Sequence, residues 1–344
     1  MSSSNCPSSE LQARLVRYDD LIPCRSAFID TRTPGSDHKE NFTIIGHGVA
    51  ENPEQHVHID IPHGFNIGAA RQPPGCVNSQ HSHETAEVFV VHAGQWAFHF
   101  GANADGASVE LGPGDIISIP VGVFRGFSNI GKDIGFLFAV LGGDDPGRVT
   151  WAPYVFESAR EHGLVLLKSG RLIDTTRGET VPDGEAVMPP TTQEDAEKLR
   201  KMNAEEAARC VIREPELTTF ERQPFDDNVR VFEAPLIGPA CSEDGVPAGR
   251  MDWNHGFHVR RQRLEPGAQT PAFIRDEPEV LMMQSGKLEL VCNDEQILLT
   301  QGDVMTVPVG TPRRYRNNAE DDAVVYVVRG GDRPGGFRLV DLAS

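Results

Sequence analysis

The sequence predicts an all-β protein in which two related antiparallel barrels lie in one chain, with short helices between them. Three observations support this fold class: short apolar segments bounded by turn residues, an internal repeat, and a helix-forming stretch in the middle of the chain. Short strands at regular spacing are typical of antiparallel sandwiches and barrels. At 344 residues the chain is long enough for two domains that each bury a core.

The internal repeat consists of residues that recur at the same spacing in the second half of the chain. The first block contains His63, Gly64, Phe65, Gly75, Glu87 and Gly94, and it recurs as His255, Gly256, Phe257, Gly267, Glu279 and Gly286. The second block contains Gly114, Pro120, Arg125 and Asn129, and it recurs as Gly302, Pro308, Arg313 and Asn317. A repeat of this kind indicates that one structural unit occurs twice.

The repeat and the turn signals divide the chain into parts. We expect an N-terminal arm with irregular strands at residues 1–62, a first barrel at 63–150, a segment with helices at 151–230 and a second barrel at 231–344. Within the first barrel, short apolar segments predict strands at residues 65–71, 86–91, 96–100, 108–111, 115–119 and 135–141.

Two stretches between the barrels predict helices. Residues 154–162 can form a short helix that Gly163 ends, and residues 191–210 contain good helix formers after a capping box of Thr191 and Glu194. Charged residues recur in the second stretch at helical spacing, which is typical of a solvated face. We expect these helices to cover barrel surfaces or to carry an inter-barrel or subunit contact, without chemistry of their own.

The composition limits the partners. The formal net charge of −18 argues against nucleic acid and against an anionic membrane surface, because the field of the protein would repel both. The N-terminus has no apolar targeting region, and no apolar run is long enough to span a bilayer. The 6 cysteines lack the spacing of a disulfide framework or a zinc site. We therefore expect a cytoplasmic protein with a small-molecule substrate, and a homo-oligomer is left open.

The stretch GCVNSQHSHETAEVFVVHAG at residues 75–94 contains the candidate metal ligands His81, His83 and Glu87. Residues two apart on a β-strand point to the same side, so an extended segment would send all three side chains to one face. Two imidazoles and one carboxylate can bind a first-row transition metal, and with open coordination positions they form the site of non-haem Fe(II) oxygenases. We expect one divalent metal there, first of all Fe(II), with Mn, Ni and Zn as alternatives.

This stretch and the one at residues 114–129 together resemble the sequence pattern of the cupin superfamily. The residues that match it are Gly75, His81, His83, Glu87, Gly94, Gly114, Pro120, Gly122 and Asn129. Arg125 departs from the pattern, because it stands where cupins have a histidine as fourth metal ligand. The resemblance implies two double-stranded β-helix, or jelly-roll, barrels in one chain, an arrangement called a bicupin.

The resemblance also implies a function. Similar bicupins include quercetinase-type dioxygenases, aromatic ring-cleaving dioxygenases and oxalate decarboxylases. The first expectation is a metal-dependent oxidoreductase of the cupin dioxygenase type that acts on a small aromatic or enol-type substrate, with Arg125 as a catalytic group that neutralises negative charge. Two alternatives stay open: a non-oxidative lyase, decarboxylase or isomerase, and a non-catalytic bicupin that binds a small molecule.

The second barrel lacks the ligand set. Phe273 and Arg275 stand at its His-X-His positions, while Glu279 and Arg313 occupy the remaining two. A guanidinium group is permanently charged and repels a cation, and a buried charge must be paired. We therefore expect a buried ion pair of Glu279 with Arg313, shared with Arg275, in place of a metal.

The first barrel allows an alternative of the same kind. Glu87 could pair with Arg125, and His81 and His83 would then be ordinary buried histidines. Strand alternation predicts that His92 points away from the interior. The aromatic residues near the site are expected to form barrel core, or in part to border the metal and favour a flat apolar ligand: Phe89, Trp96, Phe98, Phe100, Phe124 and Phe127.

Overall fold

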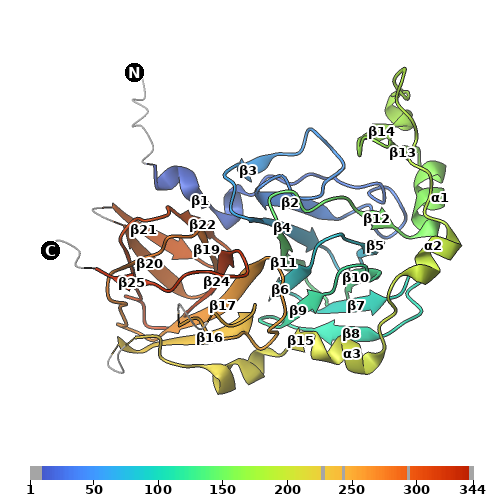
Figure 1. The fold of residues 1–344 in the computed structure, drawn as a ribbon. Helices are drawn as coiled ribbons and strands as arrows, with labels where there is room; N and C mark the ends of the chain where they lie inside the picture. The colour runs from blue at the N-terminus through green and yellow to red at the C-terminus, as the bar shows by residue number, and fades with distance from the viewer. Residues whose placement is uncertain (1–9, 226–228, 242–244, 293–294, 341–344) are drawn as a thin grey trace, which may run out of the picture. The chain divides into compact units, whose positions relative to one another are not determined.

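The structure is a computed structural model that describes residues 10–225, 229–241, 245–292 and 295–340. The chain forms two compact units (Figure 1): the first unit is Ile22–Pro215, and the second unit is Met1–Leu21 with Glu216–Ser344. Each unit contains one barrel. The segment 1–62, which the sequence analysis treats as one arm, is divided between the units after Leu21, and residues 1–9 of it lie outside the described residues.

The first unit is built from two β-sheets with a shared apolar interior. The larger sheet has the strand order β15-β9-β6-β11-β4-β2-β3, and the smaller has the order β12-β5-β10-β7-β8. The strands of the larger sheet are β2 (Glu40–Ile45), β3 (Val57–Ile59), β4 (Phe65–Gln72), β6 (Glu87–Ala93), β9 (Ile116–Ile119), β11 (Gly135–Gly142) and β15 (Val211–Ile212). Those of the smaller sheet are β5 (Val77–Ser82), β7 (Trp96–Phe100), β8 (Ser108–Leu111), β10 (Arg125–Asn129) and β12 (Thr150–Trp151).

Alternate residues of facing strands form the core of the first unit. The ring of Phe89 on β6 lies 5.1 Å from that of Phe98 on β7 and 5.2 Å from that of Phe127 on β10, measured between centroids. His92 is on the opposite face of β6, as alternation predicts, where its ring packs at 5.5 Å against Phe138. The expectation that the aromatic residues form barrel core is confirmed for these rings.

Gly94 makes the turn between β6 and β7 possible. Its φ is +88°, in the left-handed region, and a Cβ atom there would lie 2.7 Å from the Cα atom of Gly135. Only glycine combines this conformation with so close an approach of two backbones. The turn starts β7 so that it runs in the smaller sheet, beside β10.

The second unit repeats this arrangement. Its larger sheet has the order β1-β22-β19-β24-β17-β16 and its smaller sheet the order β21-β20-β23-β18-β25. The strands of the larger sheet are β1 (Leu15–Val16), β16 (Val231–Ile237), β17 (Phe257–Leu264), β19 (Glu279–Ser285), β22 (Val304–Val307) and β24 (Ala323–Gly330). Those of the smaller sheet are β18 (Phe273–Ile274), β20 (Lys287–Cys292), β21 (Glu295–Thr300), β23 (Arg313–Arg316) and β25 (Arg338–Leu339).

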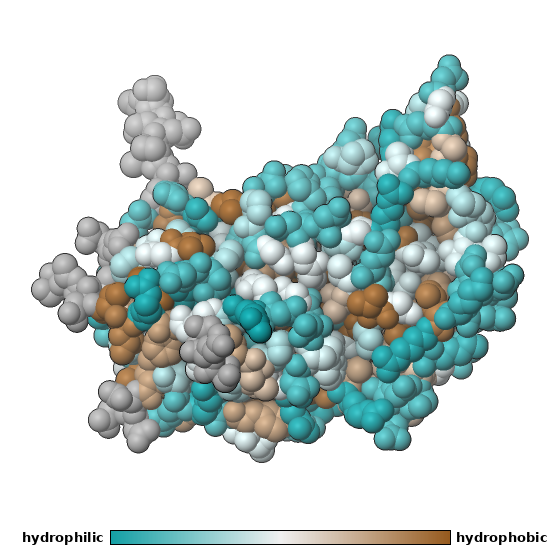
Figure 2. All heavy atoms as spheres, in the orientation of Figure 1, coloured by the Kyte–Doolittle hydropathy of each residue, from teal (hydrophilic) through white to brown (hydrophobic). Residues whose placement is uncertain are grey.

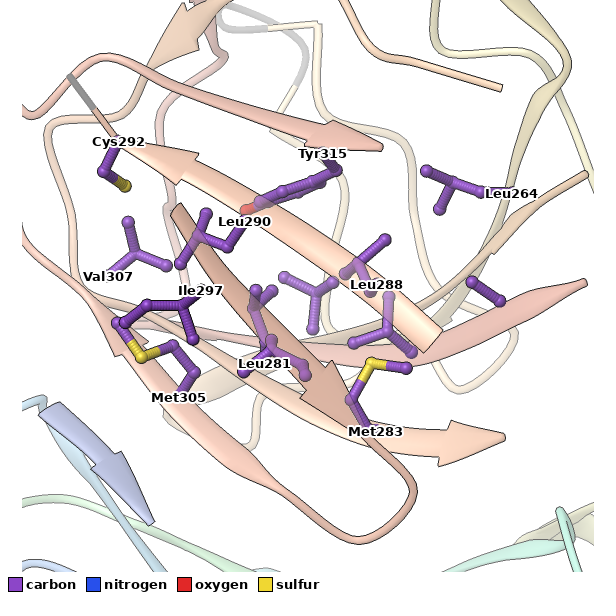
Figure 3. Packing of buried hydrophobic residues seen from close by; sticks show 14 of the residues in the cluster. Leu264, Leu281, Met283, Leu288, Leu290, Cys292, Ile297, Met305, Val307 and Tyr315 are labelled. Atoms are coloured by element: carbon purple, nitrogen blue, oxygen red, sulfur yellow. The ribbon is translucent and has the colours of Figure 1, made fainter. Parts of the chain in front are cut away.

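Side chains from both sheets fill the second barrel. Figure 3 shows Leu281, Met283 and Met305 from the larger sheet pointing toward Leu288 and Leu290 from the smaller one. All five side chains are fully buried. These side chains form part of the apolar core of the second barrel.

The segment after β12 contains short elements rather than one long helix. They are α1 (Pro153–Glu161), β13 (Leu164–Leu166), β14 (Leu172–Asp174), η3 (Thr175–Arg177), α2 (Gln193–Lys198), α3 (Ala204–Arg209) and η4 (Glu214–Phe220). Short 3-10 helices also flank β1, namely η1 (Gln12–Arg14) and η2 (Tyr18–Asp20). The helix expected at 154–162 is confirmed as α1, one residue earlier at each end.

The prediction of one continuous helix over residues 191–210 is wrong. The N-cap of α2 is Thr192, not Thr191, and a capping box of Asn203 with Glu206 begins α3. The break places Met202 in the core of the barrel, where it is 3% exposed. Burial of this side chain and a strong N-cap residue outweigh the helix propensity of the residues between them.

The hydrophilic character of the surface agrees with the many charged residues in the sequence. Figure 2 shows a face that is mostly hydrophilic, with hydrophobic residues scattered among polar ones. Within the described residues, no helix combines the length and the apolar character that crossing a membrane requires.

Candidate metal centre

The three predicted ligands lie together inside the first unit. His81 is near the end of β5, His83 directly follows β5, and Glu87 begins β6. One ligand atom of each residue lies within 4.8 Å of the others, and all three side chains are buried. Nε2 of His83 is 3.7 Å from Oε1 of Glu87. Among the residues that the structure describes, this is the group of His, Cys, Asp and Glu side chains that could hold a metal ion.

The route by which these residues meet differs from the expected one. The sequence predicts all three on one extended segment, whereas β5 ends at Ser82 and residues 83–86 turn the chain into the other sheet. Glu87 therefore approaches the histidines from the opposite sheet of the barrel. The single-strand expectation is wrong because a bend between two sheets can bring residues four apart together as well as strand alternation can.

The protonation of His81 is determined by its backbone neighbour. Nδ1 of His81 lies 2.7 Å from the carbonyl oxygen of Ser79. A carbonyl oxygen only accepts hydrogen bonds, so Nδ1 carries the proton and Nε2 keeps its lone pair. Asn78 Nδ2 is farther from the same nitrogen, at 3.4 Å. A metal-binding histidine typically donates its other ring N–H in this way, which fixes the ring orientation.

Both imidazoles are neutral. Burial, reinforced by the positive charge of Arg125, holds the pKa of His81 and of His83 well below the usual range. Nδ1 of His83 is buried and has no hydrogen-bond partner among the described residues. Neutral imidazole is the form that binds a metal, so the donor set fits a divalent cation without losing a proton first.

Arg125 forms a buried ion pair with Glu87. One terminal nitrogen of Arg125 donates to Oε2 of Glu87, and the other donates to the carbonyl oxygen of His81 at 2.9 Å. Burial raises the pKa of the Glu87 carboxyl, and Arg125 opposes this shift. The ion pair considered as an alternative is therefore present, but it uses only Oε2 and leaves Oε1 toward His83.

The ligand atoms line a cavity of about 80 Å³. Its wall also contains Phe89 and Phe127 from the core, while Arg125 is not part of it. Residues of the expected irregular arm supply much of the rest: Cys24, Ala27, Phe28, Asn41, Phe42, Thr43, Gly48, Val49, Ala50 and Gln55. Asn41 has a buried Nδ2 without a hydrogen-bond partner among the described residues. Sequence reasoning missed this wall, because small and apolar residues in an irregular segment carry no motif.

Trp151 is a further residue of the site that the sequence did not reveal. Its ring packs 5.2 Å from that of His81, between centroids, and it lines the cavity. Its Nε1 donates to Oε1 of the buried Glu51 at 2.6 Å. Burial raises the pKa of Glu51 to about 8, although hydrogen bonds from Trp151 and from the backbone N–H of Ile29 lower it. Glu51 thus orients the ring that covers His81.

We expect Glu51 to make stability fall as the pH rises. Its pKa is about 8 in the folded protein and near 4.5 in an unfolded chain, so between these values the folded state holds one proton more. The free energy of unfolding then decreases by up to roughly 1.4 kcal/mol per pH unit in that range. Glu51→Gln should lack this slope. The check is the difference between the two proteins in urea unfolding at pH 5 and pH 7, and equal slopes would contradict it.

The corresponding position in the second unit is a charge cluster. Oε2 of Glu279 lies 2.6 Å from Nε of Arg275, and Oε1 lies 2.8 Å from Arg313 and 2.5 Å from the hydroxyl of Tyr315. Burial alone would raise the pKa of Glu279, but the two guanidinium groups and Tyr315 lower it to about 2. The predicted ion pair of Glu279 with Arg313, shared with Arg275, is confirmed.

Comparison with known proteins agrees with this architecture. The model of the Cupin domain family matches residues 69–141 in the first unit and 260–329 in the second. The chain belongs to the cupin superfamily, and because each unit holds one such barrel it is a bicupin. The predicted fold class, two jelly-roll barrels with short intervening helices, is confirmed.

Similar proteins include decarboxylases and a plant protein. Oxalate decarboxylase from Bacillus subtilis has a TM-score of 0.55 and 13% identity, over 95% of this chain and 78% of that chain. The Lactobacillus farciminis oxalate decarboxylase formate complex has a TM-score of 0.56 and 11% identity, over 95% of this chain and 88% of that one. The likeness to both structures shows a shared fold.

A curated relative matches a shorter stretch. Germin-like protein subfamily 1 member 7 of Arabidopsis thaliana is 37% identical over 90 residues. The match covers 25% of this chain and only 39% of the germin-like protein. This likeness supports the cupin family and says nothing of the remainder of either chain.

Proposed function

We propose that the first unit binds one divalent transition metal through His81, His83 and Glu87 and catalyses a non-oxidative reaction of a small carboxylic acid, as a decarboxylase, lyase or isomerase. The observation that carries the proposal is the neutral, buried His-His-Glu donor set at the wall of a small cavity. Metals bound by three protein ligands keep positions for a substrate. The Bacillus subtilis oxalate decarboxylase that shares this fold is described with Mn(II) centres, which supports a metal other than iron.

The size of the cavity favours a small substrate. Its volume of about 80 Å³ is well below the roughly 300–1,000 Å³ of pockets that take drug-sized ligands. A multi-ring aromatic molecule would not fit without movement of the wall. The flat aromatic substrate of the first expectation is therefore less well supported than a compact acid.

The residues of the chain have separate tasks in this proposal. A bound metal would supply Lewis acidity toward a carboxylate or carbonyl oxygen. Arg125 opposes the rise that burial causes in the pKa of Glu87, and it binds Oε2, so that Oε1 is the oxygen turned toward His83. Because both terminal nitrogens of Arg125 are engaged and it is not part of the cavity wall, we assign it a positioning role in place of the catalytic role expected from the sequence. Phe89, Phe127 and Trp151 supply apolar surface to the cavity wall.

Metal content tests the proposal directly. We expect one metal per chain by elemental analysis, lost in His81→Ala and retained in the matched control His38→Ala, whose side chain is 76% exposed. Turnover of small carboxylic acids should require the metal and proceed unchanged without O₂. A parent protein that binds no metal would instead support the non-catalytic bicupin, in which Glu87 and Arg125 form only an ion pair.

The oxygenase interpretation remains the second candidate. Two histidines and one carboxylate with open positions are also the ligand set of non-haem Fe(II) oxygenases, and no histidine stands at the fourth position. O₂ consumption coupled to loss of substrate, with Fe(II) as the only activating metal, would favour it over the non-oxidative reaction.

Asn41 provides a test of substrate orientation. Its unpartnered Nδ2 at the cavity wall can donate to a substrate oxygen, and a hydrogen bond to a charged group contributes about 1.5–3 kcal/mol. Asn41→Leu should therefore lower kcat/KM roughly 10- to 100-fold, while metal content stays the same. Thr43→Val is the control, because the hydroxyl of Thr43 already bonds Gln55. An unchanged kcat/KM in Asn41→Leu would remove Asn41 from the site.

A further inference from the structure

The second unit has its own cavity, of about 280 Å³, and arginine residues dominate its wall. The guanidinium groups are those of Arg222, Arg260, Arg275 and Arg329, and Glu233 is the carboxylate among the lining residues. All of these residues belong to the second unit. Apolar groups, including Phe337, complete the wall.

This cavity is the counterpart of the metal-centre cavity. Through the internal repeat, Arg275 stands at the position of His83, and Arg260 on β17 stands at the position of Gly68 on β4. Arg329 pairs with His258 in the way that Leu141 pairs with Asn66. His83, Gly68 and Leu141 all line the first cavity. The same hollow of the barrel thus has a metal-ligand wall in one unit and a cationic wall in the other.

Arg260 is a buried cation without an ion-pair partner. Its side chain donates to the carbonyl oxygens of Ile237 and Pro247, each at 2.9 Å. Within the described part of the chain, no carboxylate lies at ion-pair distance from it. Burial lowers the pKa of Arg260 to about 10; the Glu233 carboxylate opposes this shift, while Arg329, Arg222 and Arg275 add repulsion. A buried charge in this state is costly unless something negative comes close to it.

The other arginines also keep unused donors. Arg275 is 4% exposed, and its terminal nitrogens donate no hydrogen bond to a described residue. Arg329 binds Glu277 and the carbonyl oxygen of Gly335 through two of its three nitrogens. Arg222 binds Glu233 through one nitrogen, at 2.9 Å. The wall therefore presents N–H groups for which the described protein supplies no acceptor.

The charges do not balance within the described residues. Counting Arg313 with the four arginines of the wall, five guanidinium groups face three carboxylates, which are Glu233, Glu277 and Glu279. Two formal positive charges remain. This local excess stands against a chain whose net charge is −18.

We propose that this arginine-lined cavity binds a small dianion whose charge is carried by carboxylate or phosphate oxygens. Guanidinium groups match the planar, bidentate geometry of these oxyanions better than any other side chain. A dianion would neutralise the two excess charges, and the cavity has room for a compact molecule. The site is separate from the metal centre and does not depend on the reaction proposed for it.

Calorimetric titration of the full-length protein tests the site. We use succinate and inorganic phosphate in separate arms, at constant ionic strength, with chloride as the monoanion control. One of the two dianions should bind saturably at one site per chain, and the tighter arm identifies the oxyanion. Binding of neither, or a response to chloride of the same size, would overturn the proposal.

Variants locate the binding. Arg222→Gln, at the half-exposed end of the cavity, should raise the Kd at least tenfold. Arg260→Gln should raise it in the same way if the variant folds. Arg338→Gln is the matched control, because this arginine pairs with Asp276 on the surface of the same unit. His81→Ala should leave the Kd unchanged, which separates this site from the metal centre. An unchanged Kd in Arg222→Gln, or lost binding in His81→Ala, would refute it.

Discussion

Glu279→Ala is expected to lower the free energy of unfolding of the second unit by about 3–5 kcal/mol, because it leaves Arg275 and Arg313 buried without their shared carboxylate. The ionised carboxylate stabilises the fold fully above pH 4.5, and this contribution is lost as the pH falls toward the folded pKa of about 2. Urea unfolding at pH 7 and at pH 3 measures the effect, which should be smaller at pH 3.

Two comparisons separate charge from packing in this experiment. Glu279→Ala combined with Arg275→Met and Arg313→Met removes the cations as well, and it should recover part of the lost stability. The metal content of the first unit should stay the same in both variants. A stable Glu279→Ala protein that has lost its turnover would contradict the assignment, since it would place chemistry in the second barrel.

Much of the fold could be predicted because the informative residues act locally. Gly94 is a good example: a left-handed turn with a close backbone neighbour requires glycine, so the residue marks the start of a hairpin in the sequence itself. The internal repeat then gives the same signal a second time, in the second barrel. The same reasoning predicts the second-barrel ion pair, because a buried glutamate with arginine at two of the three other ligand positions has few arrangements open to it.

The wall of the metal centre could not be predicted, because it is made by contacts distant in sequence. Trp151, which packs against His81, follows the first barrel in the sequence. Glu51, which positions Trp151 by a hydrogen bond, comes from the N-terminal segment before that barrel. β5 lacks the usual signal of a strand, because all of its residues after Val77 are polar and yet buried. Polar residues facing a cavity break the alternation on which strand prediction depends.

The pairing of Arg125 with Glu87 leaves one carboxylate oxygen for the proposed metal. A carboxylate has two oxygens, and Arg125 engages one of them while the other faces His83. Sequence alone cannot distinguish these oxygens.

Arg125→His is expected to tighten metal binding and to reduce turnover. The backbone of Arg125 pairs with that of His81, so an imidazole at this position starts next to the ligand set. If a four-ligand structural zinc site is worth about 10–16 kcal/mol, one added ligand contributes about 3 kcal/mol, or roughly 100-fold in affinity. Competition with a chelator measures this change.

Turnover should fall in Arg125→His for two reasons. A fourth protein ligand occupies a coordination position that the substrate needs, and Glu87 loses the cation that holds its Oε2. Arg125→Lys is the control, because it keeps a positive charge near Glu87 without adding a ligand. If Arg125→His binds metal where the parent protein binds none, the parent is a metal-free bicupin stabilised by the Glu87–Arg125 pair, and the enzymatic proposal must be abandoned for small-molecule binding.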